Sequence, residues 1–128
     1  MGKPNYPLTI AEKHKVLYWE PLPEAELAAL GDLYAEQELW HDALEFYEKA
    51  GDEDRLRQVR DTALSTADLV LFLNACRCLG APPDEEGLKR LKAKGLELGK
   101  EATAERVDGL LLGKEEEAKL AAKGRKRS

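Results

Sequence analysis

Apolar residues in this chain recur at every third or fourth position, in stretches of about ten to sixteen residues that glycine and proline separate. Leu27, Leu30 and Tyr34 have this spacing, and Gly51 and Gly80 follow two later stretches as stop signals. The sequence has 22 Leu and 17 Ala but four Val, four Thr and one Ile, so helix formers far outnumber the β-branched residues that suit strands. It therefore predicts an all-α fold of about six to seven helices.

A length of 128 residues is typical of one domain, and a hydrophobic fraction of 43% is enough to fill a core. We expect a single helical domain over residues 1–128. No stretch approaches the roughly 18 apolar residues of a membrane span, and residues 1–6 lack the apolar segment of a secretory signal. These observations predict a cytoplasmic protein. Cys76 and Cys78 point in different directions on a helix, so we expect free thiols.

Several polar residues stand where helices are expected to begin. Thr9 and Glu12 have the spacing of a capping box, and Asp52 precedes a fourth helical stretch. Ser65 or Thr66 interrupts that stretch and is expected to cap the fifth helix.

The C-terminal part has more charge and fewer apolar residues. We expect Gly109 and Gly113 to interrupt the last helical pattern. Residues 114–128 are predicted to form a charged segment that is helical to about Lys123 and docks weakly, with Leu120 as its anchor and a frayed end after Gly124.

One segment, residues 24–57, has small and aromatic residues at the spacing of a known repeat. It resembles a tetratricopeptide (TPR) repeat, although Leu27 and Arg55 stand where that family prefers Trp and Pro. The resemblance implies two antiparallel helices that come closest at the small residues Gly31 and Ala43. The residues that carry the resemblance are Leu30, Gly31, Tyr34, Ala43, Tyr47 and Ala50.

A single repeat cannot bury its own apolar faces, so the later helices should stack on it as looser pairs. The resemblance therefore implies a short TPR-like α-solenoid of antiparallel helix pairs. The alternative is a compact irregular helical bundle in which one hairpin has the repeat spacing by chance.

In TPR arrays the first helix of each pair lines the inner groove. The resemblance places Ala28, Asp32 and Glu36 there, and a looser alignment adds Arg57 and Asp61. Small alanine side chains would leave the groove open, and Asp32 with Glu36 would make it negative. Chaperone-binding members hold a peptide carboxylate with Lys and Asn, whereas Ala28 and Asp32 occupy the matching positions here. We therefore do not expect a C-terminal carboxylate as the ligand.

The sequence has no recognisable catalytic or metal-binding pattern. His14 and His41 are the two histidines, and they lie in different helical stretches. Phosphate-binding loops and a nucleophile elbow are absent from the sequence. We expect a protein that is not an enzyme and that has no cofactor and no metal.

Charge is distributed unevenly along the chain. Residues 20–54 contain twelve carboxylates and one lysine, a net charge of −11, whereas residues 55–128 carry a net charge of +4. This asymmetry favours a non-catalytic protein-interaction module that binds a basic peptide or helix of a partner. The alternative is a self-assembling structural protein whose acidic and basic halves dock head to tail. The basic end, Arg125 to Arg127, is short and lacks aromatic residues, so we do not expect nucleic acid as a partner.

Overall fold

The structure of the protein is a computed structural model that describes residues 6–126. It is helical throughout, with no strand in this part of the chain, so the all-α prediction is confirmed. None of the helices within residues 6–126 combines the length and the apolar character needed to cross a bilayer. The elements are α1 (Ile10–His14), a π-helical turn η1 (Lys15–Trp19), α2 (Glu24–Glu36), α3 (Trp40–Ala50), α4 (Glu53–Thr66), α5 (Leu69–Leu79), α6 (Glu85–Glu97) and α7 (Glu101–Lys126).

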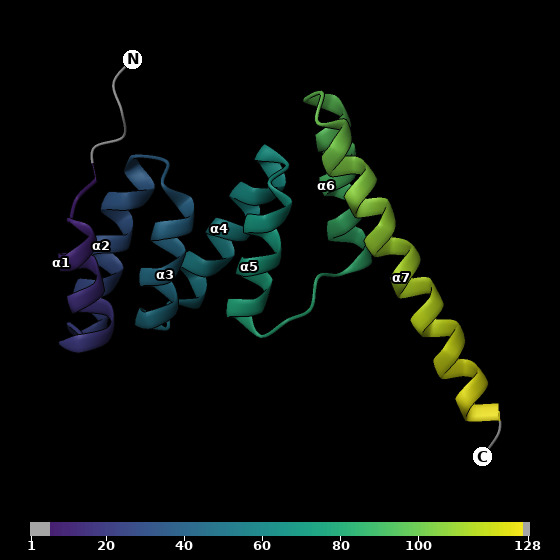
Figure 1. Ribbon diagram of the computed structural model, residues 1–128, viewed down its shortest axis with the longest axis horizontal. Coiled ribbons are helices and arrows are strands. Elements are labelled where there is room, and N and C mark those ends of the chain that lie inside the picture. The colour runs from purple at the N-terminus through teal and green to yellow at the C-terminus, as the bar shows by residue number, and fades with distance from the viewer. Residues whose placement is uncertain (1–5, 127–128) are drawn as a thin grey trace.

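Helices that follow one another in sequence pack as pairs. The most extensive contacts join α2 to α3, α4 to α5, and α6 to α7. Neighbouring pairs meet where α3 contacts α4 and α5, and where α4 contacts α6. Figure 1 shows the pairs side by side in chain order, with the far end of α7 running out beyond the others.

A buried apolar cluster extends from η1 to α7 and includes residues of each pair. The rings of Tyr34 and Phe46 stack between α2 and α3 with their centroids 5.2 Å apart. The spacing of Leu88, Leu91 and Leu98 predicts that all three face inward, but Leu98, the residue after the end of α6, is 48% exposed. The largest fully buried side chains are Tyr34, Phe46, Phe72, Leu71, Leu88, Leu91, Val59 and Val107.

The crossing of α2 and α3 is tight at Gly31, as the small residue predicts. A Cβ atom on Gly31 would lie 2.5 Å from Cε1 of Tyr47 and 3.2 Å from Cβ of Phe46. Ala43 is completely buried on the facing helix. The two helices therefore approach to a distance that only a glycine at position 31 permits.

Side-chain caps begin most of the helices. Thr9 and Glu12 form both halves of the capping box, with each nitrogen-to-oxygen distance at 3.1 Å. Asp52 accepts a hydrogen bond from the backbone N–H of Arg55, and Asp84 accepts one from Gly87.

The predicted cap of α5 is wrong. The hydroxyl of Thr66 donates to the carbonyl of Thr62 within α4, so it is not free to cap the next helix. The chain instead turns at Ala67, whose φ of 53° is left-handed, and Asp68 accepts from the N–H of Leu71.

The last helix is longer than predicted, and its predicted anchor is exposed. α7 is continuous for 26 residues, so Gly109 and Gly113 do not interrupt it, and the helix predicted to end near Lys123 extends to Lys126. Glycine within a helix costs roughly 1 kcal/mol but does not by itself end it. Leu120 is 68% exposed, so the predicted anchor is wrong. Residues 127–128 of the expected frayed end lie outside the described residues.

Candidate functional site

A groove of about 640 Å³ lies between α2 and α4, with α3 contributing to its lining. We call it the α2–α4 groove. None of the side chains that line it in the described part of the chain is Lys, Arg or His. Its lining residues are Asp32, Ala35, Glu36, Trp40, Tyr47, Gln58, Val59, Asp61 and Thr62.

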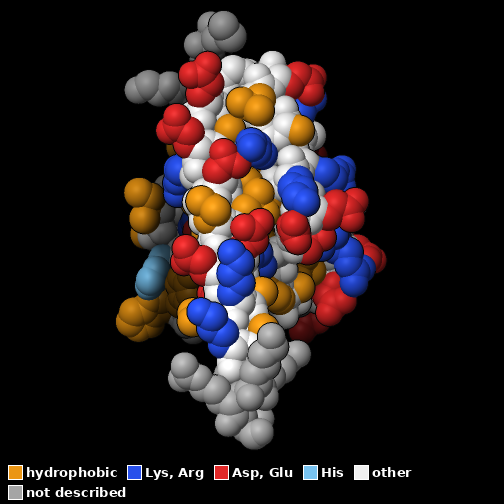
Figure 2. Space-filling model, turned by 90° about the vertical axis from the view of Figure 1, so that its right-hand side faces the viewer, with side chains coloured by type: hydrophobic (Ala, Val, Ile, Leu, Met, Phe, Trp, Pro, Cys, Tyr) orange, Lys and Arg blue, Asp and Glu red, His pale blue; other side chains and the backbone are white. Residues whose placement is uncertain are grey.

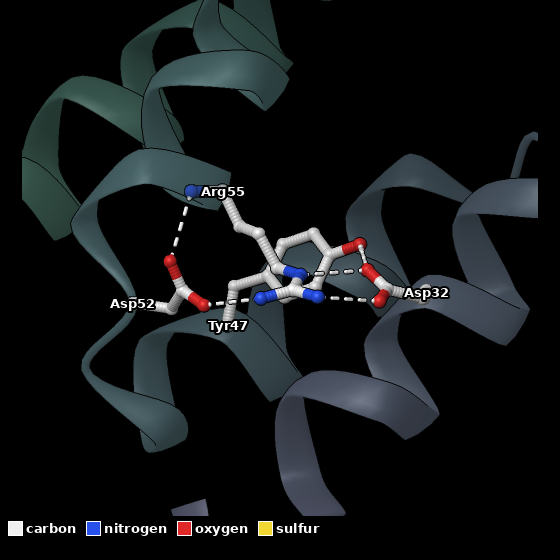
Figure 3. Close-up of polar contacts among 4 residues, drawn as sticks. All are labelled: Asp32, Tyr47, Asp52 and Arg55. Atoms are coloured by element: carbon white, nitrogen blue, oxygen red, sulfur yellow. Dashed lines mark hydrogen bonds and ion pairs between the residues drawn. The ribbon is translucent and has the colours of Figure 1, made fainter. Parts of the chain in front are cut away.

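One carboxylate of the groove is already paired within the chain (Figure 3). Oδ1 of Asp32 accepts hydrogen bonds from Oη of Tyr47 at 2.7 Å and from Nε of Arg55 at 2.8 Å. Oδ2 of Asp32 accepts from Nη2 of Arg55 at 2.7 Å, which makes the contact bidentate. Nη1 of Arg55 donates to Oδ2 of Asp52 at 2.6 Å. Arg55 therefore links α2 to the beginning of α4.

These contacts stabilise the charged form of both partners. The hydrogen bonds from Arg55 hold the pKa of Asp32 below its usual value, and the bond from Tyr47 lowers it further. The bonds to Asp32, followed by those to Asp52, raise the pKa of Arg55. Burial, together with the hydrogen bond to Asp32, raises the pKa of Tyr47. Near neutral pH Asp32 is therefore ionised and Tyr47 remains a hydrogen-bond donor.

The other two carboxylates, on Glu36 and Asp61, are exposed and lie on different helices. Neither forms an ion pair with a side chain among residues 6–123. With Asp32 neutralised by Arg55, these two carboxylates supply the uncompensated negative charge of the groove.

The groove also contains a large aromatic side chain. Trp40 is half-buried, packs against the core on one side and lines the α2–α4 groove on another. Its neighbour Ala35 is small and leaves room beside it. The site therefore combines a partly exposed tryptophan side chain with two free carboxylates.

Three of the five predicted groove residues, Asp32, Glu36 and Asp61, come together in the structure. Ala28 lies in a separate hollow of about 650 Å³ beside Asp52 and Arg55. Arg57 is not in the groove.

The side chain of Arg57 is engaged along its own helix. It pairs with Glu53 and Asp54 at 3.2 Å each, within the first turn of α4. Its charge is therefore already compensated on the outer surface of α4.

No sequence pattern indicated that Trp40 lines the groove or that Arg55 contacts Asp32. Trp40 begins the apolar pattern of α3, and that pattern assigns it to the core. Its position as the first residue of a helix was the available signal of partial exposure. The pairing of Arg55 with Asp32 joins residues 23 positions apart and has no local signal.

Neither cysteine thiol lies in the α2–α4 groove. Cys76 and Cys78 are free, as predicted. Burial and the neighbouring carboxylate of Glu48 raise the pKa of Cys78 to about 12, so it is protonated at neutral pH. Among residues 6–126 no three His, Cys, Asp or Glu side chains are grouped so that they could hold a metal ion.

Comparison of the chain with protein-family models, with curated proteins and with solved structures finds no match.

Proposed function

We propose that this chain is a non-catalytic protein-interaction module whose α2–α4 groove binds a basic peptide or helix of a partner. The observation that carries this proposal is the pair of free carboxylates, Glu36 and Asp61, in a groove lined by no cationic side chain. A basic segment would compensate their charge. The groove volume of about 640 Å³ is large enough to hold several side chains.

The proposal includes the architecture that creates the groove. We propose that the helix pairs form a short TPR-like stack in which α2 and α4, the first helices of two pairs, line the inner surface. The tight crossing at Gly31 and the contacts between successive pairs support this arrangement. The alternative, an irregular bundle, predicts no regular placement of first helices along one groove.

The expected affinity is modest. An exposed ion pair contributes roughly 0 to 1 kcal/mol, so two carboxylates alone give weak binding. Most of the binding free energy would have to come from apolar contact with Trp40 and from the fit of the segment to the groove.

A titration followed by two-dimensional nitrogen–proton NMR tests the proposal. The probe is a capped peptide that contains arginine and lysine among alanines, at low salt. We expect the amide signals of Glu36, Trp40 and Asp61 to shift. The double variant Glu36→Lys with Asp61→Lys should lose these shifts.

The matched control changes the same charge at a distance from the groove. Glu101 and Glu105 are exposed on α7 and lie outside the groove, so replacing both with Lys should leave peptide binding intact. Equal loss in the two double variants would mean that the peptide responds to net charge, and the groove proposal would then be rejected.

The second candidate function is self-assembly, which the charge asymmetry favours. The net charge of −11 over residues 20–54 could attract the positive half of a second copy. Exposed apolar residues are available as well, because Ile10 is 90% and Trp19 is 74% exposed. Figure 2, however, shows acidic, basic and hydrophobic side chains intermingled on the side of the molecule that carries α7. That side is therefore not a uniformly basic surface.

Sedimentation velocity over a series of protein and salt concentrations separates the two functions. An interaction module remains a monomer throughout. Head-to-tail assembly would produce larger species at low salt that dissociate as salt screens the charges.

A further inference from the structure

We infer that the α2–α4 groove selects arginine, through a guanidinium group that stacks on Trp40 and pairs with the carboxylates of Glu36 and Asp61. This inference rests on the proposed function and adds the chemistry of the partner. It distinguishes arginine from lysine, which charge complementarity alone does not.

The first argument is the combination of an aromatic face with free carboxylates. A cation above a tryptophan ring is attracted by the negative face of the ring, and Trp is the strongest of the aromatic residues in this contact. Trp40 packs against the buried core, and this contact restricts the movement of its ring before a ligand binds. Glu36 and Asp61 approach the same groove from α2 and α4.

The second argument is that the chain itself contains a guanidinium held in this way. Arg55 is bidentate to Asp32, and its guanidinium carbon lies 5.9 Å from the centroid of the Tyr47 ring. The α2–α4 groove contains the same kinds of group, an aromatic ring at Trp40 and the carboxylates of Glu36 and Asp61, but no cation of the described chain lines it. An arginine from a partner would supply the cation that the groove lacks.

The third argument is geometric. A guanidinium is flat, has five N–H donors in a fixed fork and is weakly hydrated, so it can stack and still donate to carboxylates on two sides. A lysine ammonium is compact and strongly hydrated, and it makes the same contacts less well. We therefore expect arginine to bind about threefold to tenfold more tightly than lysine.

The test uses the variant Trp19→Phe, which leaves Trp40 as the one tryptophan of the chain. Trp19 is exposed and lies outside the groove, so this change leaves the groove intact. Three capped pentapeptides serve as probes, with arginine, lysine or uncharged citrulline between alanines. Binding is measured by NMR shifts of groove amides, and stacking is measured by the fluorescence of Trp40.

We expect the arginine peptide to bind most tightly and to change the Trp40 emission, while citrulline binds least. The double variant Glu36→Gln with Asp61→Asn should weaken the arginine peptide about tenfold. Glu101→Gln with Glu105→Gln is the matched control and should not change its affinity. These substitutions are on exposed side chains, so the fold is retained.

The outcomes separate this inference from the proposed function. Equal affinity for arginine and lysine, or arginine binding without a change in Trp40 emission, overturns arginine selection and leaves the basic-segment proposal standing. If neither charged peptide shifts a groove amide, the proposed function itself is rejected.

Discussion

Gly31 lies where α2 crosses α3, and any side chain there would collide with the ring of Tyr47. That ring cannot move freely because its hydroxyl donates to Asp32. We expect Gly31→Ala to destabilise the fold by about 1 to 3 kcal/mol, even though alanine is the better helix former.

Gly109 provides the matched control for this substitution, because a Cβ atom on it would have no neighbour within 4 Å. Gly109→Ala should leave stability unchanged or raise it by up to about 1 kcal/mol. Thermal melts of the two variants measure the contrast. A wild-type melting temperature for Gly31→Ala would contradict the close crossing.

Arg55 gives a prediction about pH. Its hydrogen bonds lower the pKa of Asp32, and its backbone and side-chain bonds lower that of Asp52. A carboxyl with a lowered pKa in the folded state contributes stability above its unfolded pKa of about 4, and this contribution is lost as pH falls through the folded pKa. Arg55→Gln should therefore lower the melting temperature at pH 7, by about 3 to 6 °C for a loss of about 1 kcal/mol after allowance for exposure. The difference should shrink toward pH 2.

Arg57→Gln is the control at pH 7, because Arg57 is exposed and its partners lie on its own helix. We expect it to have little effect on the melting temperature. If Arg55→Gln lowered the melting temperature equally at pH 7 and pH 2, the ion pairs would not be the cause.

At the scale of helices, the sequence predicted most elements from local signals. Thr9 and Asp52, each a polar residue directly before a stretch with helical apolar spacing, cap their helices as predicted. The end of α4 could not be predicted, because Ala67 adopts a left-handed conformation that only its tertiary setting makes favourable. The TPR resemblance placed Asp32, Glu36 and Asp61 at a groove. It could not predict that Arg55 pairs with Asp32, because the two residues lie 23 positions apart in the sequence.

The far half of α7 is the least supported helical segment. Side chains from Glu115 to Lys123 are all exposed, and an unpacked helix of this length is only marginally stable in water. Removing residues 115–128 should therefore lower the melting temperature by less than about 2 °C. Hydrogen exchange of these amides should be fast in the full chain. A broad transition in the truncated chain would show instead that the segment supports the core.

A longer truncation is the comparison for this prediction. Removing residues from 105 onward takes away Val107, which is completely buried. That chain should lose the packing of α6 against α7 and melt at a much lower temperature.

Over the whole molecule, stability should vary from one helix pair to the next. The α6–α7 pair is joined to the rest chiefly through the contact of α6 with α4. Leu91 is completely buried in α6, and Leu91→Ala should cost about 2 to 5 kcal/mol. We expect this variant to lose hydrogen-exchange protection in α6 and α7 while α2 and α3 stay protected. Uniform loss of protection would indicate a single cooperative unit.

The exposed end of α7 has a practical consequence for measuring the interactions of this protein. Anchoring the chain to a biosensor surface through Lys119 or Lys123 would attach it by a segment that packs on no other helix. The α2–α4 groove is lined by residues of α2, α3 and α4, so this attachment would leave its lining side chains unmodified.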